Sequence, residues 1–308
     1  MWANVLLSAA IFAAGCCILA SIVRLRVWPF SVAAELLEPA LLGLAGCMLA
    51  ACFAGTFLAA GAAFALFVVG AVALVVAIRA GTAPRIDENA ALLRIAHANL
   101  LDSPKAAARF ADWARNNGAE LIAITEPPPG ETEKLRPLFP NHPFSLQSDD
   151  TGRRRVVVFS KHALDPHESP DINVLAFSLR RRDCVFEIVC AHPTIPISPA
   201  FEARRDEVIG RAFAAAHSAQ TAAVVIGDLN TTPTGPVLAA MRRAHGFRRA
   251  GVSAFSPTWM APFFGLGLTL DHICVSIHCA VRSYKVGPFI GSDHRPIFAE
   301  IGACAAGG

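Results

Sequence analysis

Charged side chains are nearly absent from the first quarter of the 308-residue chain. Residues 1–83 contain only five of them: Arg24, Arg26, Glu35, Glu38 and Arg79. This scarcity excludes an ordinary soluble domain, in which about one residue in four is charged. Residues 1–23 carry no charge at all. At about 1.5 Å per residue, they are long enough to cross a hydrocarbon core of about 30 Å.

A second uncharged run covers the 40 residues from 39 to 78, which is about twice the length that one crossing needs. It predicts two helices joined by a short turn near residues 55–61. Together with residues 1–23 this gives three transmembrane helices in a membrane domain of residues 1–84, with the lipid bilayer as its partner. A secretory signal peptide fits poorly, because the start lacks basic residues and the apolar stretch is too long.

The segment AAGC at residues 13–16 resembles a lipoprotein processing site, whose cysteine would be acylated. The missing basic start speaks against this alternative. Small residues are also what helix packing in lipid favours, so we interpret the segment as part of a helix interface.

The basic residues that flank the spans predict the orientation of the chain. With three crossings, Arg24 and Arg26 lie on the same side of the membrane as Arg79 and everything after it. Lysine and arginine near the ends of spans favour the cytoplasm, although two glutamates share the first loop. We therefore expect a multi-pass protein of the inner membrane with residues 85–308 in the cytoplasm.

The nine cysteines contain no CxxC pair and do not have the spacing of a disulfide-rich scaffold. Four of them fall in the expected spans, and we interpret the other five as small core residues. Their spacing agrees with a reducing compartment. The chain also lacks internal repeats, and its only low-complexity sequence is the alanine-rich spans.

After residue 85 short apolar runs alternate with helical patterns. Ser103, Pro104 and Gly118 are suitable residues for the start and end of a helix over 105–117. Further helices are expected at 199–217 and 235–245, and strands at 92–100, 119–126, 156–160, 172–180, 184–192, 222–228, 269–276, 281–286 and 295–301. The mixture predicts an α/β catalytic domain, residues 85–308, with two mixed sheets packed as a sandwich and flanked by helices in four layers.

Polar residues terminate several of these strands, where ligand sites of such folds collect. A single Asp or Asn at a strand end is more often a turn or a helix cap, but here the number and kind of residues matter. They are Asn99, Glu126, His192, Asp228, Asn230, Asp271, His272, Asp293 and His294. Carboxylates and amides without a His/Cys quartet favour Mg²⁺ or Mn²⁺ over zinc, and such an ion suits hydrolysis of phosphoesters.

Eight segments occur in the order and spacing of the endonuclease/exonuclease/phosphatase family, which the chain resembles from about residue 92 to 301. They are ANL, IAITEP, VVVFSK, AHP, IGDLNTTP, TW, LDHICVS and GSDHRPIF. The occurrence of IGDLN followed by SDHRP is specific to this family. The resemblance implies a metal-dependent nuclease or phosphatase, and the preceding spans resemble membrane-anchored bacterial members.

The resemblance also implies a metal site. Glu126 is expected to be the principal ligand of Mg²⁺ or Mn²⁺, with Asn99 and Asp293 close to the ion. The family often has an acid or amide two residues after the first Asn, where this chain has Leu101. Asp102 lies one residue further on, so the number of bound ions stays open.

The catalytic roles follow in the same way. By resemblance, Asp228 positions or deprotonates the attacking water, and Asn230 donates a hydrogen bond to the phosphate. His294 faces the scissile phosphate, paired with Asp271. His192 is expected to be the second histidine that faces the phosphate.

The sequence leaves the substrate open. After residue 85 there are 23 Lys and Arg against 22 Asp and Glu, whereas a nuclease needs basic residues along the phosphate backbone. The alternatives are therefore a nuclease-like hydrolase acting on nucleic acid, a phosphatase or phosphodiesterase acting on a lipid-linked phosphate, and a catalytically silent membrane scaffold. The apolar stretch at 260–268 is either a membrane-facing loop or a buried one. No protein partner is implied.

Overall fold

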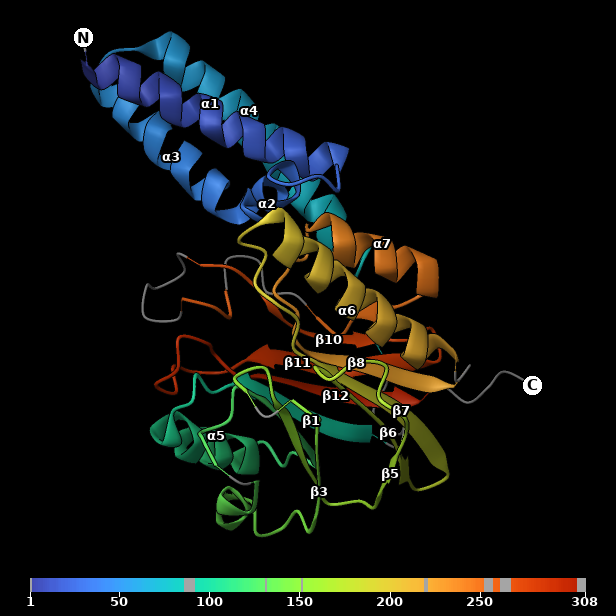
Figure 1. Cartoon of the computed structure of the whole chain (residues 1–308). Coiled ribbons are helices and arrows are strands. Elements are labelled where there is room, and N and C mark those ends of the chain that lie inside the picture. Colours follow the sequence, from blue (N-terminus) through green and yellow to red (C-terminus); the bar gives the residue numbers. More distant parts are fainter. Residues whose placement is uncertain are drawn as a thin grey trace. The chain divides into compact units, whose positions relative to one another are not determined.

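A computed structural model of the protein describes residues 2–85, 92–130, 132–150, 152–218, 221–251, 257–260 and 267–303. The chain divides into two compact units (Figure 1). The first contains residues 1–81 and 231–239, and the second contains residues 82–230 and 240–308. The grouping of the short segment 231–239 with the N-terminal helices is not predicted from the sequence.

The first unit is built on four helices: α1 (Trp2–Val23), α2 (Phe30–Glu35), α3 (Leu37–Phe53) and α4 (Phe57–Arg79). Two stretches, Asn4–Val23 and Phe57–Arg79, are long and apolar enough to cross a membrane. The third predicted span, α3, is apolar but has 17 residues, or about 26 Å of helix. The turn between α3 and α4 begins slightly before the predicted one and places Gly55 at a φ of 69°.

Three of these helices pack through a small residue. A Cβ atom on Gly70 of α4 would lie 2.8 Å from Leu41 of α3 and 3.0 Å from Ile18 of α1. The absence of a side chain lets the helices approach closely, as small residues do in membrane bundles. Leu44, Ala63 and Leu74 complete this apolar core.

The second unit contains two six-stranded sheets. The first has the order β11-β12-β1-β2-β4-β3, with β1 (Leu92–Asn99) parallel to β2 (Leu121–Thr125). The second has the order β5-β6-β7-β8-β10-β9, with β7 (Cys184–Ala191) parallel to β8 (Ala222–Asp228). All other pairings are antiparallel, so both sheets are mixed. The remaining strands are β3 (Phe144–Gln147), β4 (Val156–Ser160), β5 (Leu164–Pro166), β6 (Val174–Arg181), β9 (Arg248–Arg249), β10 (Asp271–Val275), β11 (Cys279–Val286) and β12 (Ile297–Ala303).

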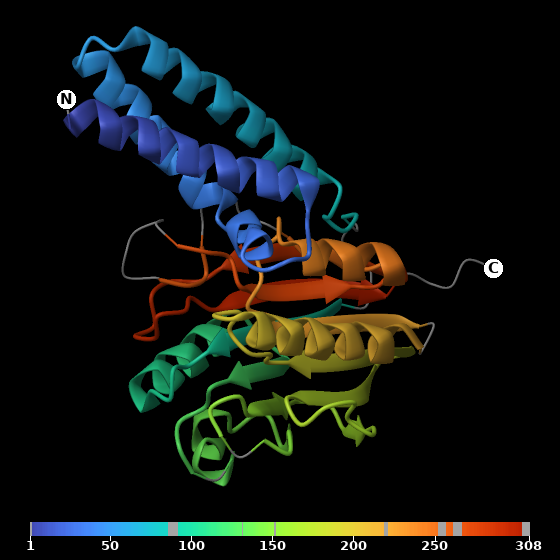
Figure 2. The same ribbon diagram turned by 45° about the horizontal axis from the view of Figure 1, so that its top comes forward.

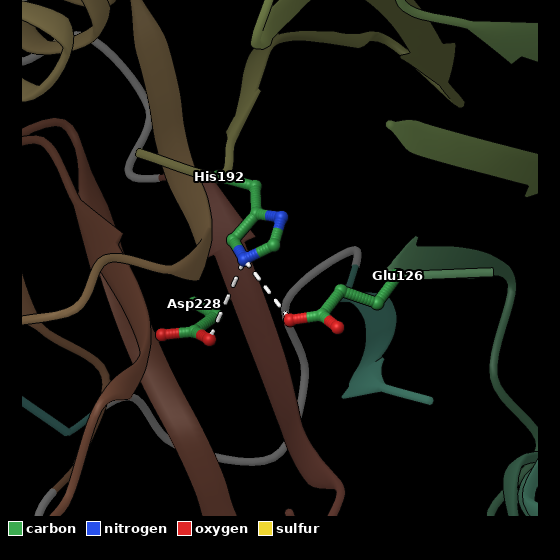
Figure 3. A group of neighbouring side chains, drawn as sticks. All are labelled: Glu126, His192 and Asp228. Atoms are coloured by element: carbon green, nitrogen blue, oxygen red, sulfur yellow. Dashed lines mark ion pairs between the residues drawn. The ribbon is translucent and has the colours of Figure 1, made fainter. Parts of the chain in front are cut away.

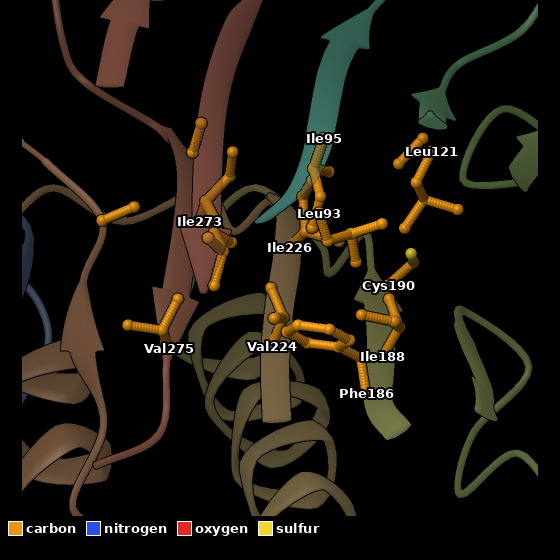
Figure 4. Packing of buried hydrophobic residues seen from close by; sticks show 14 of the residues in the cluster. Leu93, Ile95, Leu121, Phe186, Ile188, Cys190, Val224, Ile226, Ile273 and Val275 are labelled. Atoms are coloured by element: carbon orange, nitrogen blue, oxygen red, sulfur yellow. The ribbon is translucent and has the colours of Figure 1, made fainter. Parts of the chain in front are cut away.

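The sheets pack face to face with helices outside them (Figure 2). Ile95 of β1, Val224 and Ile226 of β8 and Ile273 of β10 belong to the core between the sheets (Figure 4). Phe110 of α5 (Pro104–Asn116) packs on the outer face of the first sheet, and α6 (Pro199–Ser218) covers the second sheet. Two mixed sheets flanked by helices are therefore confirmed. The elements not yet named are α7 (Pro236–His245) and the short 3-10 helices Thr132–Lys134 and Arg136–Leu138.

The registers align the strand ends that carry polar residues. Asn99 lies opposite Thr125 in the parallel pair β1 and β2, so Glu126 follows beside it. Asp228 lies opposite Asp271 in the antiparallel pair β8 and β10. The ends of both sheets thus bring these side chains to one edge of the sandwich.

Gly227 allows β7 and β8 to approach each other at this edge. Its φ is 150°, and a Cβ atom there would collide with the backbone carbonyl oxygen of Ala191. Backbone cannot move aside cheaply, and L side chains rarely adopt this conformation. We expect Gly227→Ala to lower the free energy of unfolding by about 2–4 kcal/mol, measured as a lower midpoint of thermal unfolding of the full chain.

Gly210→Ala in α6 is the matched control, because its new Cβ would meet only Met241 Sδ, at 3.9 Å. Alanine in a helix interior is favoured over glycine by about 0.5–1 kcal/mol, so this variant should be as stable as the wild type or more stable. Equal midpoints for the two variants would contradict the close approach at Gly227.

Candidate active site

The inward-facing side chains of four strands change from apolar to polar at the same edge. Successive side chains of a strand point to opposite faces, so residues two apart share a face. On β1 the inner row begins with Leu93 and Ile95, which belong to the core between the sheets, and ends with the buried His97 and Asn99. The inner row of β8 likewise ends in Asp228, and that of β7 continues into His192 directly after the strand. The antiparallel β10 begins at the same edge with Asp271. The strand period therefore gathers these groups where the core stops.

Asn99 connects the two sheets. Its Nδ2 donates hydrogen bonds to Glu126 Oε1 at 2.9 Å and to Asp228 Oδ2 at 3.0 Å. The orientation of the amide is fixed because its Oδ1 accepts a hydrogen bond from the backbone N–H of Leu101 at 3.0 Å. Asn99 thus presents its nitrogen to the carboxylates and holds both in place. Its expected position beside a metal stays a prediction.

Two carboxylates and a histidine form a group that could hold a metal ion (Figure 3). One ligand atom each from Glu126, His192 and Asp228 lies within 4.8 Å of the others. His192 Nε2 is 3.6 Å from Glu126 Oε1 and 3.7 Å from Asp228 Oδ2. Burial, together with the neighbouring His294, lowers the pKa of His192 to about 3. The ring is therefore neutral at pH 7, and these contacts are not ion pairs.

The donor chemistry of this group fits a divalent cation. Burial raises the pKa of Glu126 and of Asp228 above their ordinary values, because each carboxylate has lost water. A hard cation would compensate two such crowded oxygen donors, and a neutral imidazole adds a nitrogen ligand. Backbone strain accompanies the site, since Glu126 has a φ of 44°.

Asp293 and Asp102 lie outside this group. The carboxylate of Asp293 accepts hydrogen bonds from Trp259 Nε1 at 3.1 Å and Ser292 Oγ at 3.4 Å. Its expected role as a metal neighbour stays a prediction. Asp102 accepts a hydrogen bond from Arg153 Nε at 2.7 Å, so it pairs with an arginine at the edge of the site.

Asp271 joins two histidines at the centre of the site. Its Oδ2 lies 2.8 Å from His294 Nδ1, and its Oδ1 lies 3.0 Å from His97 Nε2. Burial alone would raise the pKa of Asp271, but His294 and His97 hold it well below its usual value. Burial alone would lower the pKa of His294, but the charges of Asp271 and Asp228 raise it. His294 is therefore a cation at pH 7, and its Nε2 lies 3.7 Å from Asp228 Oδ2.

Asn230 is held in a left-handed conformation with a φ of 49°, which asparagine tolerates better than most residues. Its backbone N–H donates to Asp228 Oδ1 at 3.0 Å, and its Nδ2 donates to the carbonyl oxygen of Pro193 at 3.0 Å. The buried Arg205 donates to the carbonyl oxygen of Asn230 at 3.2 Å. The predicted contact of Asn230 with a phosphate stays a prediction.

His97 is not among the site residues predicted from the sequence. It carries no motif of its own, and its side chain is fully buried on β1. The two-residue period of a strand could have identified it. His97 lies two residues before Asn99 and therefore continues the inward-facing row of Leu93 and Ile95. The apolar stretch 260–268 lies mostly outside the described residues.

Residues 89–294 match the model of the family described as "Endonuclease/Exonuclease/phosphatase family". No curated protein matches the chain by sequence. The endonuclease domain of TRAS1, a telomere-specific non-LTR retrotransposon, is a similar solved structure. It is 16% identical in sequence with a TM-score of 0.55, and the match covers 70% of this chain and 100% of that one. An endonuclease/exonuclease/phosphatase from Beutenbergia cavernae has 16% identity and a TM-score of 0.56 over 70% of this chain and 72% of that one. The human Nocturnin catalytic domain with bound sulfate has 14% identity and a TM-score of 0.55 over 70% and 96%.

His97→Ala removes a buried hydrogen-bond partner of Asp271 and leaves a cavity. We expect it to lower the free energy of unfolding by about 3 kcal/mol, measured by denaturant unfolding. His97→Gln should recover part of this loss, because its amide can still donate. His167→Ala is the control, since His167 makes an equally short contact with Glu187 at 3.0 Å but is 42% exposed, and exposed pairs contribute little. A loss no larger than that of the control would contradict the role of His97.

Proposed function

The chain belongs to the endonuclease/exonuclease/phosphatase family, and on that premise we propose that it is a membrane-anchored phosphoester hydrolase of the phosphodiesterase or endonuclease type that depends on Mg²⁺ or Mn²⁺. One observation carries this proposal. Glu126, His192 and Asp228 form a group that could hold a cation, and it lies beside His294, a histidine whose pKa is raised and whose Nε2 is 3.7 Å from Asp228 Oδ2.

The site contains a proton acceptor for the attacking water and hydrogen-bond donors for the phosphate, which hydrolysis of a phosphoester requires. Asp228, whose pKa is raised by burial, is suited to accept the proton of an attacking water. The protonated His294, held at Nδ1 by Asp271, donates from Nε2 to an oxygen of the phosphate. Asn230 has a second amide hydrogen for the same phosphate.

The metal would be held by Glu126, with Asn99 and Asp293 nearby as the resemblance implies. His192 and Asp228, which the resemblance assigns to the phosphate and to the attacking water, lie close enough to Glu126 to contribute ligand atoms as well. When bound, Mg²⁺ or Mn²⁺ neutralises charge on the phosphate oxygens. Asn99 holds the two carboxylates 2.9 Å and 3.0 Å from its amide nitrogen. The chain thereby keeps both acids in place before any ligand arrives, and such preorganisation favours catalysis.

The N-terminal helices support an anchor in the inner membrane. Two stretches are long and apolar enough to span it, and we propose that the shorter α3 is the third span. With three spans, residues 85–308, the proposed catalytic domain, lie on the same side of the membrane as the basic residues that flank the spans, which favours the cytoplasm. Residues 1–84 then form the membrane domain.

A lipid-linked phosphate is the second candidate substrate. The segment 231–239, which directly follows Asn230, groups with the N-terminal helices rather than with the second unit. The chain therefore passes from the candidate site into the proposed membrane unit within one residue. The nearly equal numbers of basic and acidic residues after residue 85 also favour a substrate smaller than a nucleic-acid duplex.

Asp228→Asn should lower kcat at least about 100-fold on any accepted substrate, because a proton acceptor is lost. We would assay the full chain in detergent with Mn²⁺ or Mg²⁺ against bis(p-nitrophenyl) phosphate, plasmid DNA, RNA and lipid phosphates. Asp112→Asn on α5 is the matched control, since that carboxylate is 69% exposed and pairs with Arg115. Excess EDTA should abolish the wild-type activity.

The choice of substrate decides between the candidates. Cleavage of DNA or RNA supports a nuclease, and activity confined to lipid phosphates supports the second candidate. Activity that persists in Asp228→Asn would contradict the proposed site. Inactivity of the wild type on every substrate would favour the silent scaffold.

Fusions to the two ends of the chain test the anchor. With three spans the ends lie on opposite sides of the membrane, whereas with two they lie on the same side. We expect a fluorescent protein that matures only in the cytoplasm to fluoresce on the C-terminus and to stay dark on the N-terminus. Fluorescence from both ends would establish two spans, and a dark C-terminal fusion would place the catalytic domain outside the cytoplasm.

A further inference from the structure

Glu35, one of the few charged residues of the N-terminal helices, binds the segment that leaves the candidate site. It is the last residue of α2 and is 5% exposed. Its Oε1 accepts a hydrogen bond from Thr231 Oγ1 at 2.8 Å. Its Oε2 accepts two more from Thr232, one from the backbone N–H at 2.5 Å and one from Oγ1 at 2.7 Å.

The neighbouring residues are shaped around this carboxylate. Thr234 Oγ1 donates to the carbonyl oxygen of Ala34 at 3.1 Å, so the segment also binds the backbone of α2. A Cβ atom on Gly235 would press against both Glu35 carboxylate oxygens and the hydroxyl of Thr231. Thr231, Thr232 and Thr234 are all buried. The segment is therefore seated on the end of α2.

Asn230, one residue earlier, is bound inside the catalytic unit. Its backbone N–H contacts Asp228, its side chain contacts Pro193, and its carbonyl oxygen accepts from Arg205. Asn230 is thus held by the second unit and Thr231 by the first. Only one peptide bond separates the two attachments, so the position of Thr231 limits the conformations open to Asn230.

We propose that Glu35 is a positioning residue for the loop 228–230. Its carboxylate, supplied by the membrane-helix unit, fixes the path of the chain after Asn230 and thereby holds Asp228 and Asn230 in their working orientation. The inference rests on the proposed function. Full activity then requires a folded membrane unit, which makes that unit part of the hydrolase as well as its anchor.

A glutamate is suited to this role because all three partners can donate to it. The backbone N–H of Thr232 can only donate, and Oε2 receives a second donor as well. A glutamine in this place keeps one carbonyl oxygen for Thr232, and its NH₂ can donate to the hydroxyl of Thr231, which is able to accept. Alanine leaves the buried N–H of Thr232 without its acceptor, which is costly.

The test compares Glu35→Ala and Glu35→Gln with Glu38→Ala in the full chain in detergent. Glu38 is a half-buried acid at the start of α3 in the same unit. Glu35→Ala should lower kcat on bis(p-nitrophenyl) phosphate about 10- to 100-fold, with little change in KM. Glu35→Gln should restore most of the rate, and Glu38→Ala should match the wild type. An unchanged kcat in Glu35→Ala would overturn the proposal.

Hydrogen exchange separates positioning from unfolding. In Glu35→Ala, amide exchange should rise at least about tenfold at residues 231–235 and stay unchanged in α6 and β8. The shift of the thermal midpoint caused by Mn²⁺ should persist. Exchange that rises equally through α6 and β8 would reveal general unfolding and overturn the positioning role.

A double-mutant cycle provides a second measurement. Thr231→Val removes one hydroxyl that binds Glu35 and keeps the shape of the side chain. If the two residues act together, the loss in Glu35→Ala combined with Thr231→Val is smaller than the product of the separate losses. Independent, multiplying losses would contradict the contact. If the wild type has no hydrolase activity, the proposed function fails, and the exchange measurement still decides whether Glu35 holds the segment.

Discussion

The alternation of side chains along a strand is the constraint on which the site depends. The same faces of β1, β7, β8 and β10 that supply the core between the sheets also carry His97, Asn99, His192, Asp228 and Asp271. Apolar residues fill the middle of each row, and the polar ones lie at the edge of the sandwich. Because the rows are rigid and closely packed, their last members converge without relying on flexible loops. Asn99 then joins the two sheets through its hydrogen bond to Asp228.

Electrostatics divide the titratable groups of the site into distinct roles. Asp271 binds His97 and His294 and stays ionised, so it stabilises the charge of His294. His192 is buried nearby and stays neutral. One imidazole therefore donates hydrogen bonds as a cation, while the other is neutral and could serve as a metal ligand beside two carboxylates. Environments that separate the pKa values of like groups in this way are characteristic of catalytic sites.

One segment of the chain groups apart from its neighbours in sequence. Residues 231–239 belong to the first unit although they lie between two parts of the second. Glu35, which in the sequence is only one of two acids in the first loop, accepts three hydrogen bonds from this segment. A buried acid needs such partners, and here they follow the candidate catalytic loop directly.

The sequence by itself determined the apolar N-terminal helices, the two mixed sheets with flanking helices, and the family, because hydrophobic period and the segments IGDLN and SDHRP are local patterns. It also named most of the polar strand ends. Only the tertiary structure decided which of them meet: His97 shares Asp271 with His294, the nitrogen of Asn99 faces the carboxylates, and Glu35 binds Thr231 and Thr232. These contacts join residues far apart in the sequence, and a local pattern contains no information about such distances.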